Sequence, residues 1–211
     1  MKIRRIRSNC QKQKEIIGVI GATSKEDATH LSSAFANYLS SVEKLEVVYV
    51  EVGDYSKLYN MLKNKWMYDE KELIYYYKGI SYLLAADEKK MAGKLRNPKQ
   101  ALYRDADVII LDLGEIFAGK EELIPICTRL FIAGNLLPWN IDSYAWLSEK
   151  ILKLYGDVGC LERYSYNLTH EQKIIWYKKS KTEMKNLPMI GDPYCMKEKD
   201  IVTIRNILYG S

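Results

Sequence analysis

The segment from Glu15 to Leu39 constrains the fold of this chain more than any other. An apolar run from Ile16 to Ile20 leads into polar residues that continue to Thr29. Apolar residues at helical spacing follow, namely Leu31, Phe35, Tyr38 and Leu39. The order of buried strand, short loop and amphipathic helix is the layout of a phosphate-binding loop. The segment therefore predicts an α/β fold in which this loop lies at one end of a central strand.

Further apolar runs alternate with helical patterns along the rest of the chain. The expected strands are Leu45–Val50, Val108–Leu113, Leu130–Ala133 and Leu187–Ile190. The expected helices are Lys57–Lys63, Asp142–Leu154, Glu171–Lys181 and Lys199–Tyr209. Leu73–Leu84 alternates in hydropathy and contains Lys78-Gly79, which predicts two strands joined by a turn. This order predicts a three-layer, doubly wound α/β domain, a P-loop NTPase-like fold with a mostly parallel sheet.

Ligands of such sheets lie beyond the carboxyl ends of the strands. We therefore expect the loops after Ile20, Val50, Leu113 and Ala133 to share one edge. Residues 15–211 are predicted to form a single domain, with the charged stretch Asp87–Lys99 as a surface excursion.

The first 14 residues carry a concentrated positive charge: Lys2, Arg4, Arg5, Arg7, Lys12 and Lys14. Without them the chain has 26 basic and 27 acidic residues and is nearly neutral. We interpret residues 1–14 as a flexible basic arm, and the alternative is an attachment site for an anionic membrane or nucleic acid.

No signal peptide or membrane-spanning run is recognisable, and the four cysteines are scattered without a zinc-site spacing. We expect free cysteines in a reducing cytoplasm. His30 and His170 are expected to be surface or capping residues, so the sequence supports no Ser/His/Asp or Cys/His catalytic device.

The polar loop lacks the residues that hold phosphate. A functional loop uses glycines so that backbone N–H groups turn inward, and a lysine for the terminal phosphates. No glycine occurs between Gly21 and Thr29, and Lys25 is the one basic residue there. Glu26 and Asp27 place negative charge where an anion would bind, at a helix N-terminus. Ser24 followed by Asp27 is also a helix-start signal, so we interpret the acids as a structural first turn of the helix.

The strand, loop and first helix resemble the MinD/ParA-type P-loop ATPases of the SIMIBI class, which position cell-division machinery, plasmids or secretion systems. Aligned on Thr29, which the resemblance implies as the Mg²⁺-binding residue, the family's essential lysine falls on Ala28 and the glycine before it on Asp27. The signature lysine that reaches across a dimer falls on Thr23, and its adjacent glycines fall on Ser24 and Lys25.

Downstream segments extend the resemblance over roughly residues 15 to 209. Asp112 resembles the acid at a strand end that orients Mg²⁺ or water, with an acid that ends a buried strand as the alternative. Glu51 falls where the family has a catalytic aspartate, and Asp54 follows three residues later. Pro138 lies in a segment resembling one that flanks the nucleotide. Asp192 and Pro193 lie in a segment resembling one that approaches the adenine; a turn with packing is the alternative for both segments.

The leading hypothesis is a catalytically degenerate MinD/ParA-like domain without catalytic residues or a cofactor, which binds a protein partner. The first alternative is a divergent ATPase that uses Lys25, Thr29 and Asp112 around Mg-ATP. The second alternative is a membrane- or DNA-binding module driven by residues 2–14. Relatives dimerise across bound ATP, so the resemblance also raises a homodimer.

Overall fold

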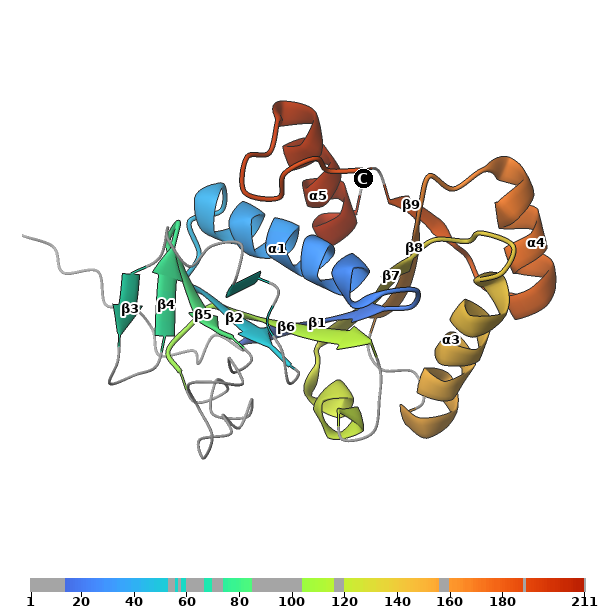
Figure 1. Cartoon of the computed structure of the whole chain (residues 1–211), viewed down its shortest axis with the longest axis horizontal. Helices are drawn as coiled ribbons and strands as arrows, with labels where there is room; N and C mark the ends of the chain where they lie inside the picture. Colours follow the sequence, from blue (N-terminus) through green and yellow to red (C-terminus); the bar gives the residue numbers. More distant parts are fainter. Residues whose placement is uncertain are drawn as a thin grey trace, which may run out of the picture.

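The computed structural model describes residues 14–52, 56, 58–59, 67–69, 74–84, 104–115, 120–155, 160–187 and 189–210. This part of the chain contains one nine-stranded sheet in the order β3-β4-β5-β2-β6-β1-β7-β8-β9 (Figure 1). The strands are β1 Glu15–Gly21, β2 Val47–Glu51, β3 Met67–Asp69, β4 Ile74–Tyr77, β5 Ile80–Leu83, β6 Val108–Glu115, β7 Arg129–Gly134, β8 Cys160–Tyr166 and β9 Lys185–Leu187. The helices are α1 Lys25–Ser41, α3 Ile141–Tyr155, α4 His170–Ser180, α5 Glu198–Tyr209 and the 3₁₀ helix η2 Glu121–Ile126.

The sheet is parallel across β5-β2-β6-β1-β7-β8-β9, and β4 alone of the described strands runs in the opposite direction, pairing antiparallel with both β3 and β5. The turn between β4 and β5 uses Lys78 at φ +49° and Gly79 at φ +76°, as the sequence predicted for a tight hairpin. Strands β1, β2, β6 and β7 end at the same edge of the sheet, which we call the rim, as expected for the strands whose loops were predicted to meet there.

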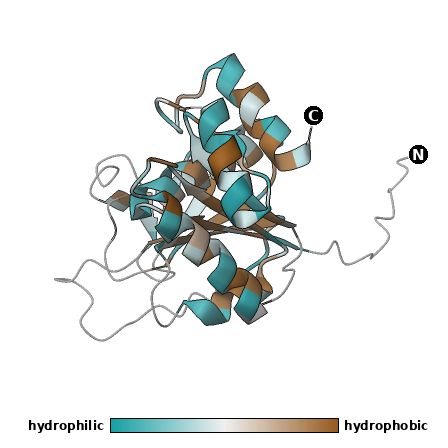
Figure 2. Ribbon diagram, turned by 90° about the vertical axis from the view of Figure 1, so that its right-hand side faces the viewer, coloured by the Kyte–Doolittle hydropathy of each residue, from teal (hydrophilic) through white to brown (hydrophobic). Residues whose placement is uncertain are grey.

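Two hydrophobic clusters, one on each face of the sheet, join the sheet to the helices that cover it and so form the three predicted layers. On one face of the sheet, side chains of α1 and α5 pack on alternate residues of the strands, such as Ile17 and Val19. On the other face, η2, α3 and Trp176 of α4 pack on the intervening residues, such as Ile20 and Ile132. Figure 2 shows the hydrophobic strands of the sheet between helices that carry both hydrophilic and hydrophobic residues.

Three elements escaped the sequence-based prediction, and one of them, β3, precedes the expected two-stranded segment Leu73–Leu84. Strand β8 was missed because charged residues interrupt it: Glu162 accepts from Arg129 and Lys185, and the buried Arg163 donates to Ser148. The helix η2 was missed because Pro125 lies inside it. The last expected strand, Leu187–Ile190, is also displaced, because β9 ends at Leu187 and the buried Ile190 packs as core after the strand.

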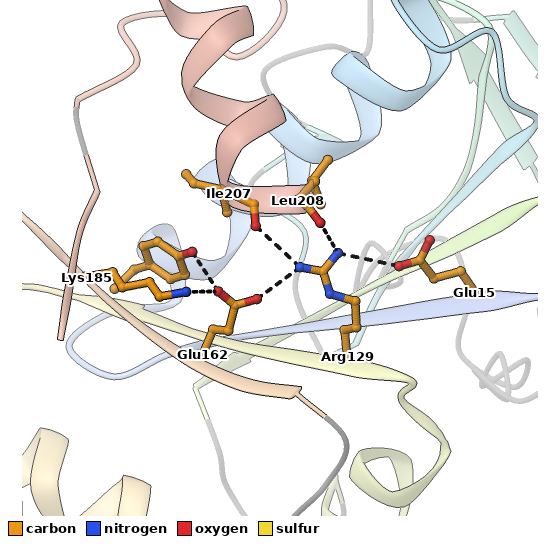
Figure 3. A network of polar contacts seen from close by, with 7 residues as sticks. Glu15, Arg129, Glu162, Lys185, Ile207 and Leu208 are labelled. Atoms are coloured by element: carbon orange, nitrogen blue, oxygen red, sulfur yellow. Dashed lines mark hydrogen bonds and ion pairs between the residues drawn. The ribbon is translucent and has the colours of Figure 1, made fainter. Parts of the chain in front are cut away.

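Arg129 connects three strands with the end of the last helix (Figure 3). Its guanidinium donates to the carbonyl oxygens of Leu208 at 2.6 Å and Ile207 at 3.4 Å, which belong to the last turn of α5. It also donates to Glu162 at 3.0 Å and lies 3.7 Å from a carboxylate oxygen of Glu15. Since the last carbonyls of a helix have no partner within it, Arg129 satisfies two of them and fixes α5 on the sheet.

Several predictions lie outside the described residues. They concern the basic arm up to residue 13, Asp54 and the excursion Asp87–Lys99. Of the expected helix Lys57–Lys63, only Leu58 and Tyr59 are described, and both are helical.

Candidate functional site

The turn between β1 and α1 is short. The polar stretch was expected to run to Thr29, but the helix-start signal of Ser24 and Asp27 is confirmed, because α1 begins at Lys25 and Ala22, Thr23 and Ser24 alone connect the two elements. Ser24 is the N-cap, and its hydroxyl accepts from the N–H of Asp27 at 3.3 Å. Gly21 is required by this turn, because a Cβ there would lie 1.9 Å from the carbonyl oxygen of Ser24.

The polar groups at the start of α1 are already engaged with one another. The N–H of Ala22 donates to the carbonyl of Ala133 at 2.8 Å. Thr23 donates its hydroxyl proton to the carboxylate of Asp27 and accepts from the N–H of Asn135 at 3.3 Å. A carboxylate therefore lies at the positive end of the helix dipole, in the place that suits an anionic ligand. Ala28 is fully buried in the core and contributes no polar group.

Asp112 is the polar centre of the rim. It is completely buried at the end of β6 and accepts from the hydroxyls of Thr29 at 2.6 Å and Tyr49 at 2.8 Å, and from the N–H of Gly114 at 3.0 Å. A β-bulge in β6 brings Gly114 back toward this carboxylate, because Val19 pairs with Asp112 and Ile20 already pairs with Gly114. Burial raises the pKa of Asp112, and the three hydrogen bonds oppose that rise by stabilising its ionised form.

Lys25 forms an ion pair with a second buried carboxylate at this rim, that of Glu51. Its Nζ is 3.1 Å from Oε1 of Glu51, which is paired in register with Asp112 on the neighbouring strand. Burial raises the pKa of Glu51, whereas Lys25 lowers it. Gly114, at φ +57°, makes room for the lysine, since a Cβ there would lie 3.2 Å from the Lys25 side chain.

The remaining sequence-predicted residues divide into two places. Pro138 lies in an exposed turn after β7. Asp192 and Pro193 lie against the middle of α1, where Asn37 donates to the carbonyl of Pro193 at 2.9 Å and Asp192 caps the N–H of Tyr194. The structure therefore brings Thr23, Ser24, Lys25, Asp27, Ala28, Thr29, Glu51 and Asp112 to one rim, and leaves Asp192 and Pro193 apart from it.

An open pocket of about 560 Å³ lies beside the start of α1. The first turns of α1 contribute Glu26, Asp27 and His30. Tyr166 at the end of β8 and the segments after β7 and β9, which include Leu137 and Met189, complete the lining. We call this cavity the acidic pocket. The segment Met189–Gly191, and not Asp192-Pro193, lines it.

Sequence reasoning missed two partners of the site. Tyr49 was taken as an ordinary strand residue, although a lone tyrosine in a Val-Val-Tyr-Val strand that ends at Glu51 is a signal for a buried polar partner. His30 was expected at the surface or as a cap, but it lines the acidic pocket and lies 3.5 Å from the hydroxyl of Tyr166.

Within the described ranges, no three His, Cys, Asp or Glu side chains form a cluster that could hold a metal ion. None of the helices described here combines the length and the apolar character that crossing a membrane requires.

Neither a protein-family model nor a curated protein matches this sequence. Solved structures do match. A ParA family ATPase from Chlorobium tepidum is 12% identical with a TM-score of 0.61, over 93% of this chain and 91% of that one. The MinC:MinD cell division protein complex of Aquifex aeolicus contains a chain that is 13% identical with a TM-score of 0.62, over 93% and 96%. A plasmid partition protein from Borrelia burgdorferi, solved with AMPPNP bound, is 12% identical with a TM-score of 0.58, over 93% and 97%.

These similarities cover nearly the whole of each chain. The chain therefore has a MinD/ParA-like fold, the three-layer, mostly parallel α/β architecture of P-loop NTPases. At sequence identities of 12–14%, the comparison shows a shared fold and nothing beyond it.

Proposed function

We propose that this chain is a catalytically degenerate MinD/ParA-like domain that acts through a protein partner, as an interaction or positioning factor, without hydrolysing ATP. The fold supports the family likeness, and the MinC:MinD complex is a solved example of this fold bound to a protein. A cytoplasmic location is part of the proposal, and Cys127 and Cys195, which are free thiols, are consistent with it.

The observation that carries the proposal is the ion pair between Lys25 and Glu51. Lys25 is the one basic residue between Gly21 and Thr29, and its ammonium lies 3.1 Å from a buried carboxylate. A polyphosphate would have to compete with Glu51 for that cation and would also approach the carboxylate of Asp27. Both effects oppose an anion at a position where nucleotide-binding relatives need several positive partners.

Calorimetric titration of ligand-stripped protein with Mg-ATP and with Mg-ADP tests the proposal. We expect no saturable heat up to about 1 mM nucleotide, a concentration at which a micromolar site would be filled. Thermal unfolding provides an independent readout. Micromolar affinity would add about 4 kcal/mol of stability at a thousandfold excess of ligand over Kd, and we expect no such shift. Micromolar binding in either assay would overturn the proposal.

A second candidate, a divergent ATPase, is supported by one specific contact. The hydroxyl of Thr29 lies 2.6 Å from the carboxylate of Asp112, the pair that the family likeness implies for Mg²⁺. If that pair holds Mg-ATP, Glu51→Gln should strengthen nucleotide binding, because it releases Lys25 for phosphate. The degenerate-domain proposal predicts that Glu51→Gln alone stays without micromolar nucleotide affinity, because the carboxylate of Asp27 remains at the start of α1.

A further inference from the structure

The acidic pocket combines negative charge with an apolar surround. Glu26 and Asp27 lie in the first turn of α1 and line the cavity. No lysine or arginine of the described chain lines it. The carboxylate of Asp27, which accepts from the neutral hydroxyl of Thr23, would therefore repel an anionic ligand and attract a cation.

The cavity is also large enough for more than a metal ion or an ammonium group. At about 560 Å³ it falls in the size range of sites that take organic groups. The side chains of His30, Tyr166 and Leu136 contribute flat or apolar walls. A planar cation on an apolar stem, which is the chemistry of an arginine side chain, suits these walls better than a small hydrated ion.

Two exposed apolar side chains line the pocket, and a third lies two residues along the chain from one of them. Leu137 is 39% exposed and Met189 is 68% exposed, and both line the cavity. Trp139 follows Leu137 by two residues and is 73% exposed. Aromatic residues and methionine are characteristic of the centres of protein interfaces, and large apolar side chains grouped at a cavity mark interaction sites.

We propose that the acidic pocket receives an arginine or lysine side chain of a protein partner, and that apolar residues beside that cation cover Leu137, Trp139 and Met189. The inference rests on the proposed function, since it supplies the chemistry of the partner that a nucleotide-free domain would bind. Charge complementarity selects this occupant, because an anionic lipid surface or a nucleic acid would meet the carboxylates of Glu26 and Asp27.

The cation site is tested with benzamidine and its neutral analogue benzamide, titrated into ¹⁵N-labelled full-length protein. We expect saturable amide shifts for benzamidine at Asp27, His30 and Tyr166, and at least fivefold weaker shifts for benzamide. Asp27→Asn and Glu26→Gln should each reduce the benzamidine affinity about threefold or more. Asp27→Asn keeps an acceptor for the Thr23 hydroxyl, and the spectrum of each variant verifies its fold.

Glu198→Gln is the matched control, because Glu198 is also an exposed acid in the first turn of a helix, but on α5. It should leave benzamidine binding unchanged. Equal binding of benzamidine and benzamide, shifts confined to other surfaces, or equal losses in all three variants would overturn the proposal.

The protein nature of the occupant is tested with labelled peptides of the type acetyl-Ala-Leu-Arg-Leu-Ala-amide. We expect at least tenfold tighter binding than for the same peptide with citrulline in place of arginine, and weaker binding to Met189→Ser. Equal affinity for the citrulline peptide, or no peptide binding, would contradict the proposal. The Mg-ATP titration is a separate measurement, so nucleotide binding would refute the proposed function, whereas a failed benzamidine titration would refute this inference alone.

Discussion

At the scale of single residues, Lys25 is the side chain that balances the charge of Glu51 at the rim. Its ammonium lies between the start of α1 and the ends of β2 and β6, and it neutralises Glu51. The side chain of Glu51 is completely buried, whereas that of Lys25 is 23% exposed. A buried carboxylate that loses its counter-ion is strongly destabilising. Glu51 therefore needs Lys25 as a partner more than the partly exposed Lys25 needs Glu51.

Lys25→Met should therefore lower the free energy of unfolding at neutral pH by about 2 kcal/mol, somewhat below the usual cost for a fully buried pair because the lysine is partly exposed. The double variant Lys25→Met/Glu51→Gln should recover more than half of that loss, since it removes the carboxylate that was left unpaired. Chemical denaturation of the two single variants and the double variant measures the coupling. Additive losses would show that the ion pair carries no coupling energy.

The same variant makes a pH-dependent prediction. Burial holds the folded-state pKa of Glu51 above its unfolded value. The folded chain therefore keeps the proton more tightly, and stability falls as pH rises from the ordinary glutamate range through the raised pKa. Removing Lys25 raises that pKa further, so the deficit of Lys25→Met should be smaller near pH 5 than near pH 8. A deficit that grows on acidification would contradict this account.

At the scale of elements, the turn from β1 to α1 depends on Gly21. The carbonyl oxygen of Ser24 would lie 1.9 Å from a Cβ at this position, so the turn must open if Gly21 is replaced. Gly21→Ala should cost about 3 kcal/mol and lower the unfolding temperature by about 6–12 °C. Gly191→Ala is the control, because no atom lies within 4 Å of a Cβ there and we expect a change within about 0.5 kcal/mol. Similar losses in both variants would argue against the tight turn.

The attachment of α5 depends on Arg129. Arg129→Met removes the donors to the carbonyls of Ile207 and Leu208 and leaves Glu162 with fewer partners. We expect a loss of about 2 kcal/mol and faster amide exchange in α5 than in α3. Lys153→Met should change neither quantity measurably, because the Lys153–Glu149 pair is an exposed pair within α3. Uniform acceleration of exchange across all helices would contradict a local role for Arg129.

Sequence patterns predicted the elements whose stability comes from burial alone. Strands β1, β2, β6 and β7 are continuous apolar runs, which a parallel sheet covered on both faces requires. Strand β8 lay beyond this reasoning, because Arg163 and Glu162 acquire partners only in the folded chain. The site divides in the same way. The rim followed from topology and the pairing of Thr29 with Asp112 was implied by the family resemblance, whereas the ion pair of Lys25 with Glu51 was not anticipated.

At the scale of the whole molecule, the described rim is stabilised by its own side chains. Asp112 has three donors and Glu51 has Lys25, so neither carboxylate depends on a bound cation for a partner. We therefore expect nucleotide to add no stability at that point. Association that depends on nucleotide, which the family likeness implies for relatives, should be absent here.

Light scattering coupled to size-exclusion chromatography tests this expectation. The molar mass should be the same in buffer and in about 1 mM Mg-ATP, whatever its value, because a polyphosphate would have to displace Glu51 from Lys25 and approach Asp27. Glu51→Gln with Asp27→Asn removes both charges and is the informative comparison. If the double variant gains nucleotide-dependent mass and the natural sequence does not, the two carboxylates are what separates this chain from its nucleotide-binding relatives. A nucleotide-dependent increase with the natural sequence would instead mean that phosphate outcompetes Glu51 for Lys25, and that the internal ion pair is a resting state of a working site.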